Sequence, residues 1–116
     1  KILIVDDEKD MVRVIELNLK DKGYNVVSAY SGEEALQKVE SEQPDLVLLD
    51  VIMGEDSDGF GVCRKIKDFA PQCKVVIYTG KLDGVDVPKA KQSGADDFTV
   101  KTEDMVHLIN TIERLL

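Results

Sequence analysis

The chain has 116 residues, of which 43% are hydrophobic and 33% are charged, and its formal net charge is −8. This size and composition fit one domain built around a single hydrophobic core. The acidic balance argues against direct nucleic-acid binding, because contacts with phosphate groups require a basic surface. No apolar run approaches the roughly 20 residues of a membrane span, and no signal peptide is recognisable. A divalent cation or a basic partner suits the charge better.

The cysteine usage and the ends of the chain complete this first outline. Cys63 and Cys73 form neither a Cys-x-x-Cys pair nor a His/Cys metal spacing, so we expect two free thiols in a reducing compartment, the cytoplasm. The chain begins at Lys1 rather than at a methionine, and we therefore expect it to be part of a longer protein. No internal repeat, low-complexity tract or linker interrupts it, which predicts one domain over residues 1–116.

Short apolar runs and amphipathic helical segments alternate from the start of the chain. Ile2–Val5 predicts a buried strand, and Asp10–Lys22 repeats apolar residues at helical spacing. Asn25–Ala29 predicts a second strand, after which Ser31 and Glu34 have the spacing of a capping box at the start of a helix. The residues expected to face inward are Met11, Val12, Ile15 and Leu19 in the first helix, and Ala35, Leu36 and Val39 in the second.

The same alternation continues to the end of the chain. Leu46–Leu49 is a continuous apolar run, as expected of a central parallel strand that is buried on both faces. Because proline is tolerated only in the first turn of a helix, the fourth helix is predicted to be short and to begin near Val87 or Pro88. The remaining segments are predicted to be a helix near Phe60–Phe69, a strand at Lys74–Tyr78, a strand at Asp97–Val100, and a helix at Glu103–Leu116 whose inward residues are Met105, Leu108, Ile109, Ile112 and Leu116.

This order of elements predicts the fold class. Strands that alternate with helices indicate βαβ units and a parallel sheet, and right-handed crossovers restrict the possible topologies. Five such units in one small domain favour an α/β, flavodoxin-like (βα)5 doubly wound sheet with the strand order 2-1-3-4-5.

Polar residues stand where the predicted strands end. Asp6 and Asp7 follow the first strand, Asp50 the third, Thr79 the fourth and Lys101 the fifth. In an open parallel sheet the site lies beyond the carboxyl ends of the strands, near the point where the strand order reverses. Carboxylates brought together there resist joint ionisation unless a cation compensates them. Mg²⁺ suits such a site, because it prefers oxygen ligands.

The chemistry of this set points to phosphoryl transfer. The Asp50 carboxylate can act as a nucleophile, since carboxylates form aspartyl-phosphate intermediates in some enzymes. A metal ion and Lys101 would neutralise the phosphoryl oxygens, and the Thr79 hydroxyl can donate a hydrogen bond to one of them.

Five motifs in order, each at the end of a predicted strand, resemble the receiver domain of two-component response regulators, which belong to the CheY-like superfamily. The motifs are ILIVDDE, LVLLDVIM, VVIYTG, SGADDF and VKT, and the resemblance spans nearly all 116 residues. It implies a phosphorylation-activated signalling switch that uses Mg²⁺. The roles that it implies are Asp50 as phosphoacceptor, Asp7 as a direct metal ligand with Asp6 beside it, the main-chain carbonyl of Ile52 as a further metal contact, Thr79 and Phe98 as the switch pair, and Lys101 as a phosphoryl contact.

The resemblance also implies partners and an output. A sensor histidine kinase or a phosphotransfer protein would donate the phosphoryl group. Phosphorylation would then change the face built from the fourth helix, fifth strand and last helix, through which a homodimer or another partner forms. Such a domain is no turnover enzyme, since it catalyses only its own phosphorylation and dephosphorylation. The alternative that stays open is a phosphorylation-independent interaction module, a pseudo-receiver, on the same fold.

Three features depart from the family pattern. Gly54 and Thr102 stand where the family usually has proline, and Gly80, Gly84 and Pro88 crowd the region of the fourth helix. A cis bond before a residue other than proline is costly, so the bond between Lys101 and Thr102 is predicted to be trans, or strained. Ile52 offers no hydrogen bond to a water that attacks a phosphorylated Asp50, which predicts slow self-dephosphorylation.

Overall fold

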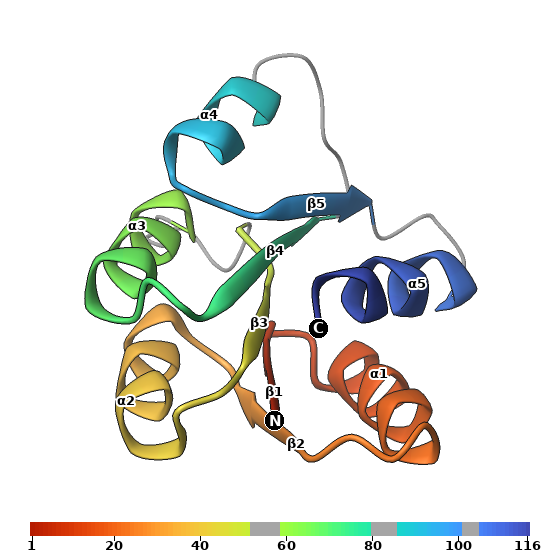
Figure 1. Cartoon of the computed structure of the whole chain (residues 1–116). Coiled ribbons are helices and arrows are strands. Elements are labelled where there is room, and N and C mark those ends of the chain that lie inside the picture. The colour runs from red at the N-terminus through yellow and green to blue at the C-terminus, as the bar shows by residue number, and fades with distance from the viewer. Residues whose placement is uncertain (52–58, 80–85, 101–104) are drawn as a thin grey trace.

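The computed structural model describes residues 1–51, 59–79, 86–100 and 105–116, without the side chains of Thr79, Asp86 and Val87. These residues form one parallel sheet with the strand order β2-β1-β3-β4-β5, and Figure 1 shows helices on both of its faces. The predicted fold class and strand order are therefore confirmed.

Each predicted element occurs, and the predicted bounds that fall on described residues lie within two residues of the observed ones; the predicted start of the last helix at Glu103 lies outside the described residues. The strands are β1 (Ile2–Val5), β2 (Val26–Ala29), β3 (Leu46–Leu49), β4 (Lys74–Thr79) and β5 (Asp97–Val100). The helices are α1 (Lys9–Asp21), α2 (Gly32–Glu42), α3 (Gly59–Phe69), α4 (Asp86–Gln92) and α5 (Met105–Leu115). Pro88 is the third residue of α4 and so lies in its first turn, as predicted.

The two faces of the sheet carry separate hydrophobic cores. One core joins the sheet to α1 and α5, and the other joins it to α2, α3 and α4. Every residue of β1 and β3 is buried, because both strands are central and covered on both faces. The continuous apolar runs that predicted these strands reflect this double burial.

Local signals explain where the helices begin and end. The Ser31 hydroxyl accepts a hydrogen bond from the Glu34 backbone N–H at 3.1 Å, which confirms one half of the predicted capping box. The first helix ends before Gly23, whose positive φ of 93° is the backbone conformation that glycine adopts at a helix end. The prediction for Leu116 is wrong: this residue follows the end of α5 and is 52% exposed, since no further turn holds it against the core.

Both cysteines are free thiols, as predicted, and both are buried. Burial raises the pKa of the Cys63 thiol, and it raises the pKa of Cys73 to about 11, because the thiolate would lose its hydration in the core.

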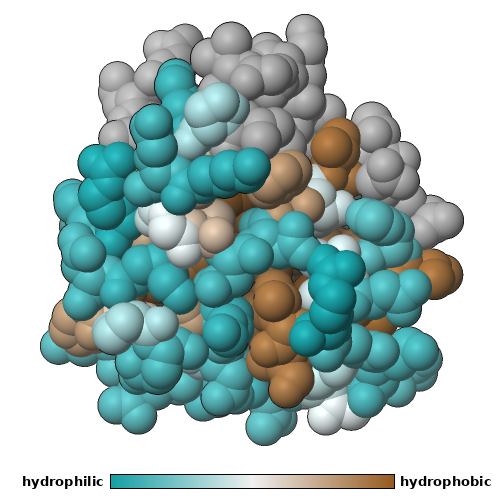
Figure 2. All heavy atoms as spheres, turned by 45° about the horizontal axis from the view of Figure 1, so that its top comes forward, coloured by the Kyte–Doolittle hydropathy of each residue, from teal (hydrophilic) through white to brown (hydrophobic). Residues whose placement is uncertain are grey.

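The outer surface agrees with the acidic, hydrophilic composition. Figure 2 shows mostly hydrophilic residues on the face that is seen when α4 is turned forward. Among the described helices, none is long and apolar enough to span a bilayer.

Candidate functional site

The ends of β1 and β3 lie side by side because the two strands pair in parallel. Val5 is the register partner of Leu49, and the Asp50 backbone N–H donates to the Val5 carbonyl at 2.9 Å. Asp6 and Asp50 are the next residues on the two strands, so this pairing brings them to the same edge of the sheet. The sequence-based expectation that these two residues converge is confirmed.

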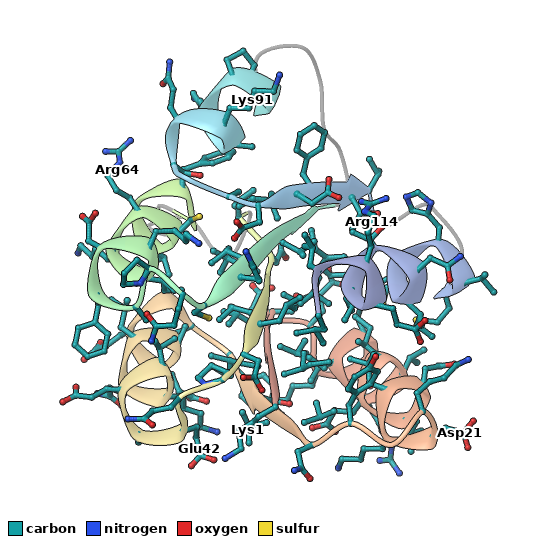
Figure 3. The ribbon with its side chains drawn as sticks, viewed as in Figure 1. Lys1, Asp21, Glu42, Arg64, Lys91 and Arg114 are labelled. Atoms are coloured by element: carbon teal, nitrogen blue, oxygen red, sulfur yellow. The ribbon has the colours of Figure 1, made fainter. Side chains whose placement is uncertain are left out.

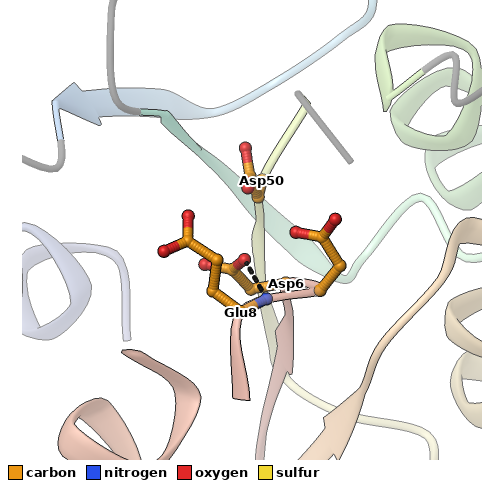
Figure 4. A group of neighbouring side chains, drawn as sticks. Asp6, Glu8 and Asp50 are labelled. Carbon is orange, nitrogen blue, oxygen red and sulfur yellow. Dashed lines mark hydrogen bonds between the residues drawn. The ribbon is translucent and has the colours of Figure 1, made fainter. Parts of the chain in front are cut away.

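Four carboxylates gather at this edge. Asp6, Asp7, Glu8 and Asp50 each have an oxygen within 4.8 Å of the others, and Figure 4 shows Asp6, Glu8 and Asp50 grouped at the strand ends. Asp6 is 0% and Asp50 1% exposed, whereas Asp7 and Glu8 are exposed. The cluster therefore has a buried inner pair and a solvent-facing outer pair.

Glu8 is the member of this cluster that the sequence analysis missed. Asp6 Oδ1 accepts a hydrogen bond from the Glu8 backbone N–H at 2.9 Å, which folds the loop after β1 back on itself. Glu8 is also the N-cap residue of α1, but its side chain makes no capping hydrogen bond. The Glu8 carboxylate instead lies beside the carboxylates of Asp6, Asp7 and Asp50. The signal that was available is the third consecutive acidic residue of the DDE motif.

The other predicted site residues belong to β4, β5 and the segments beside them. Thr79 is the register partner of Val100, the residue before Lys101, and Phe98 pairs with Ile77. Phe98 is half-buried and packs against the core that contains α3 and α4. The Thr79 side chain, Lys101 and Ile52 lie outside the described part of the chain. The predicted phosphoryl contact depends on Lys101, and the predicted metal contact and slow hydrolysis depend on Ile52. The prediction of a trans or strained bond between Lys101 and Thr102 falls on residues that are not described either.

A half-buried ion pair fixes the opposite end of β4 and β5. Lys67 Nζ lies 3.0 Å from Asp96 Oδ2 and also donates to the carbonyls of Cys73 and Pro71. The same Asp96 oxygen accepts the Val75 backbone N–H at 2.8 Å. The backbone of Asp96 in turn donates to the Val75 carbonyl at 2.8 Å. These bonds set the register in which β5 meets β4. Asp96 lies in the SGADDF motif, but the sequence analysis assigned it no role.

The donor set of the acidic cluster fits Mg²⁺. All four side chains offer carboxylate oxygens, which are the ligands that this ion prefers. A cation would also relieve the repulsion among groups that lie this close together, two of them in a buried setting. One oxygen of Asp6 already accepts the Glu8 N–H.

Comparison with known proteins agrees with this geometry. Residues 2–113 match the family described as the response regulator receiver domain. The alkaline phosphatase synthesis transcriptional regulatory protein PhoP of Bacillus subtilis is 40% identical over 101 residues, which cover 87% of this chain and 42% of that protein. The chain therefore spans about two fifths of the length of this relative.

Solved structures show the same fold over nearly the whole chain. A two-component response regulator from Clostridium difficile superposes with a TM-score of 0.92 at 32% identity, covering 98% of this chain and 93% of that one. The receiver domain of NtrX from Brucella abortus gives a TM-score of 0.91 at 32% identity, covering 100% and 98%. The chain belongs to the response regulator receiver domains, and it is a signalling module of two-component systems.

Proposed function

We propose that this receiver domain is a switch that is turned on by phosphorylation of Asp50. The observation that carries the proposal is the position of the Asp50 carboxylate, at the carboxyl end of a central strand and within 4.8 Å of three other carboxylates. A phosphoacceptor and a divalent-metal site are thereby one cluster. The domain catalyses only its own phosphorylation and dephosphorylation.

In the proposed step, an Asp50 carboxylate oxygen attacks the phosphorus of a phosphohistidine on a sensor kinase or a phosphotransfer protein. An O–P bond forms as the P–N bond breaks, and the leaving imidazole takes a proton. Asp7 and Asp50 would hold Mg²⁺, with Asp6 beside them and the Ile52 carbonyl as a further contact. When bound, the ion supplies positive charge next to the transferred phosphoryl oxygens.

Thr79 and Lys101 complete the proposed site from the neighbouring strands. The pairing of Thr79 with Val100 supports this assignment, because it puts the end of β4 level with the residue before Lys101. Lys101 would neutralise one phosphoryl oxygen and the Thr79 hydroxyl would donate to another. After phosphorylation Thr79 would move inward and Phe98 would favour a more buried rotamer, which changes the surface of α4, β5 and α5.

The output that we propose is a change in binding through the α4-β5-α5 face, either to a second copy or to another partner. The ion pair between Arg114 of α5 and Asp97 of β5 supports a face that acts as one unit, since it ties the helix to the edge strand. The domain would work in the cytoplasm, where its two buried thiols stay reduced.

The test is the intact mass of the domain after incubation with acetyl phosphate, with and without Mg²⁺. We expect a gain of one phosphoryl group that depends on Mg²⁺ and is absent from Asp50→Asn. If folded wild-type protein gains no mass under these conditions, the phosphorylation-independent interaction module becomes the better explanation.

A further inference from the structure

A groove runs between α2 and α3, two helices that lie next to each other on one face of the sheet (Figure 1). One part of it has a volume of about 180 Å³ and is lined by Leu36, Val39, Glu40, Lys65, Ile66 and Phe69. A second part, of about 470 Å³, shares three of these residues and extends to the turn before β3. The groove therefore opens toward the amino ends of the strands, whereas the acidic cluster lies at their carboxyl ends.

The rim of the groove carries a large apolar side chain in water. Phe69, the last residue of α3, is 64% exposed. Single exposed hydrophobic residues are common on protein surfaces and need no explanation. Here, however, the exposed phenyl ring stands beside a groove that is itself floored by Leu36, Val39 and Ile66. An aromatic side chain next to an apolar pocket is the arrangement of an interface anchor and its receptor.

The two walls of the groove carry opposite charge. As a whole, α2 has four glutamates against one lysine, and α3 has three basic residues against one aspartate; the charged residues of these helices that line the groove are Glu40 of α2 and Lys65 of α3. Figure 3 shows Arg64 pointing outward from α3 and Glu42 lying at the end of α2. Within the described part of the chain, Lys38 pairs with Glu34 and Lys67 with Asp96, but neither Glu40 nor Lys65 makes an ion pair. Both of these side chains are exposed and both line the groove.

We propose that the occupant of this groove is a second copy of the chain, related by a twofold axis that runs along the groove. Such an axis lays α2 of each copy over α3 of the other. It places Glu40 of one copy opposite Lys65 of the second copy, twice, and lets each Phe69 enter the groove of the other copy. A groove with Glu40 on one side and Lys65 on the other is complementary to itself under this operation, which is the requirement for an isologous dimer.

This dimer is independent of the proposed phosphorylation switch. It uses α2 and α3, whereas the proposed output uses α4, β5 and α5, so both contacts can exist on one molecule. It forms without a phosphoryl donor, and its presence or absence leaves the reading of the Asp50 mass measurement unchanged.

Sedimentation equilibrium of the untreated protein, from about 10 µM to about 1 mM, tests the proposal. We expect a reversible monomer–dimer equilibrium within that range, as is typical of a small interface. Phe69→Ser should raise the dissociation constant about tenfold or more, because it removes the anchor. The matched control is Leu17→Ser on α1, which removes a side chain that is 60% exposed and lies outside the groove. A monomer throughout the range, or equal weakening by both substitutions, would overturn the proposal.

Charge reversal tests the twofold geometry itself. Glu40→Lys and Lys65→Glu should each weaken self-association about tenfold, because each creates two like-charged pairs across the interface. An equimolar mixture of the two variants should associate about as tightly as the wild type. In that heterodimer, the lysine introduced at position 40 faces the glutamate introduced at position 65, and the native pair re-forms on the other side. A mixture that associates no better than either variant alone would refute the arrangement.

Discussion

Of Gly23, Gly32, Gly59 and Gly94 in the described part of the chain, Gly59 is the one where an added methyl group should lower the free energy of unfolding most. A Cβ built on Gly59 would lie 2.2 Å from the Cα and 2.8 Å from the carbonyl oxygen of Val51. Real Cβ atoms essentially never approach other heavy atoms closer than 3.0 Å. The obstacle is main chain, so no rotamer change can relieve it, and the start of α3 must move away from the end of β3. Overpacking of this kind costs about 1–3 kcal/mol, and we expect Gly59→Ala to lie at the upper end.

Two other glycines in the chain provide matched controls. A Cβ at Gly32 would lie 2.7 Å from Cγ2 of Val62, so the obstacle is a side chain rather than main chain, although the rotamers of a β-branched residue in a helix are restricted. Gly23 has a φ of 93° and open space around it, so Gly23→Ala carries backbone strain alone. We therefore expect a loss of about 1 kcal/mol for Gly32→Ala, about 1 kcal/mol for Gly23→Ala, and about 3 kcal/mol for Gly59→Ala.

Urea unfolding, followed by circular dichroism, measures these three free energies under identical conditions. The loss expected for Gly59→Ala is a large share of the 5–15 kcal/mol that is typical for a domain. It should lower the thermal midpoint by roughly 10 °C. The displaced residue adjoins Asp50, so phosphorylation should slow as well. If Gly59→Ala costs less than Gly23→Ala, the close approach of α3 to Val51 is wrong.

Three further predictions concern the site and the core. Mg²⁺ at about 10 mM should raise the free energy of unfolding of the wild type, measured by urea unfolding, by about 1.4 kcal/mol for every tenfold excess over the dissociation constant. Asp7→Asn should abolish most of this gain, and equal gains in the two proteins would exclude Asp7 as a ligand. The pKa of the Cys73 thiol is raised from 9.0 to about 11 in the folded state. The stabilisation of the folded state that is linked to this raised pKa is therefore fully present below pH 9. The free energy of unfolding should then fall by up to about 2.5 kcal/mol toward pH 11, because the thiol of the unfolded chain ionises first. The fall should be smaller in Cys73→Ala. Ile52→Asn should speed hydrolysis of phosphorylated Asp50 several-fold, because an amide can orient the attacking water. The decay of the phosphorylated species in intact-mass spectra measures this rate. A rate that is unchanged or lower would refute the slow-hydrolysis hypothesis.

The fold was predictable from the sequence because its main determinants are local. Continuous apolar runs mark β1 and β3, helical spacing marks α1, and Ser31 caps α2 as its spacing with Glu34 predicted. Leu116 shows the limit of the periodicity argument. The spacing extends to the last residue, but a side chain is buried only where a further turn of helix or a neighbour covers it, and Leu116 lies beyond the end of α5.

The candidate site was predictable to the extent that strand ends define it. Parallel pairing requires the residues after β1 and β3 to meet, which is why Asp6 and Asp50 could be placed together before any coordinates. Glu8 was missed because its position depends on how the loop after β1 folds back, through the bond from its N–H to Asp6. The groove between α2 and α3 was missed for a related reason. It is formed by how two helices lie against each other, and the periodicity of either helix alone does not reveal it.

The register bonds of Asp96 bear on how a switch in this domain would work. Its carboxylate holds Lys67 of α3 and the Val75 N–H together, which joins β5, α3 and β4 at the amino ends of the strands. An ammonium group with three acceptors in a half-buried setting is costly to displace. Movement that follows phosphorylation should therefore concentrate at the other end, where Thr79 pairs with Val100. In the proposed switch, this asymmetry would let a change at the acidic cluster shift the α4-β5-α5 face while the groove side of α3 keeps its place.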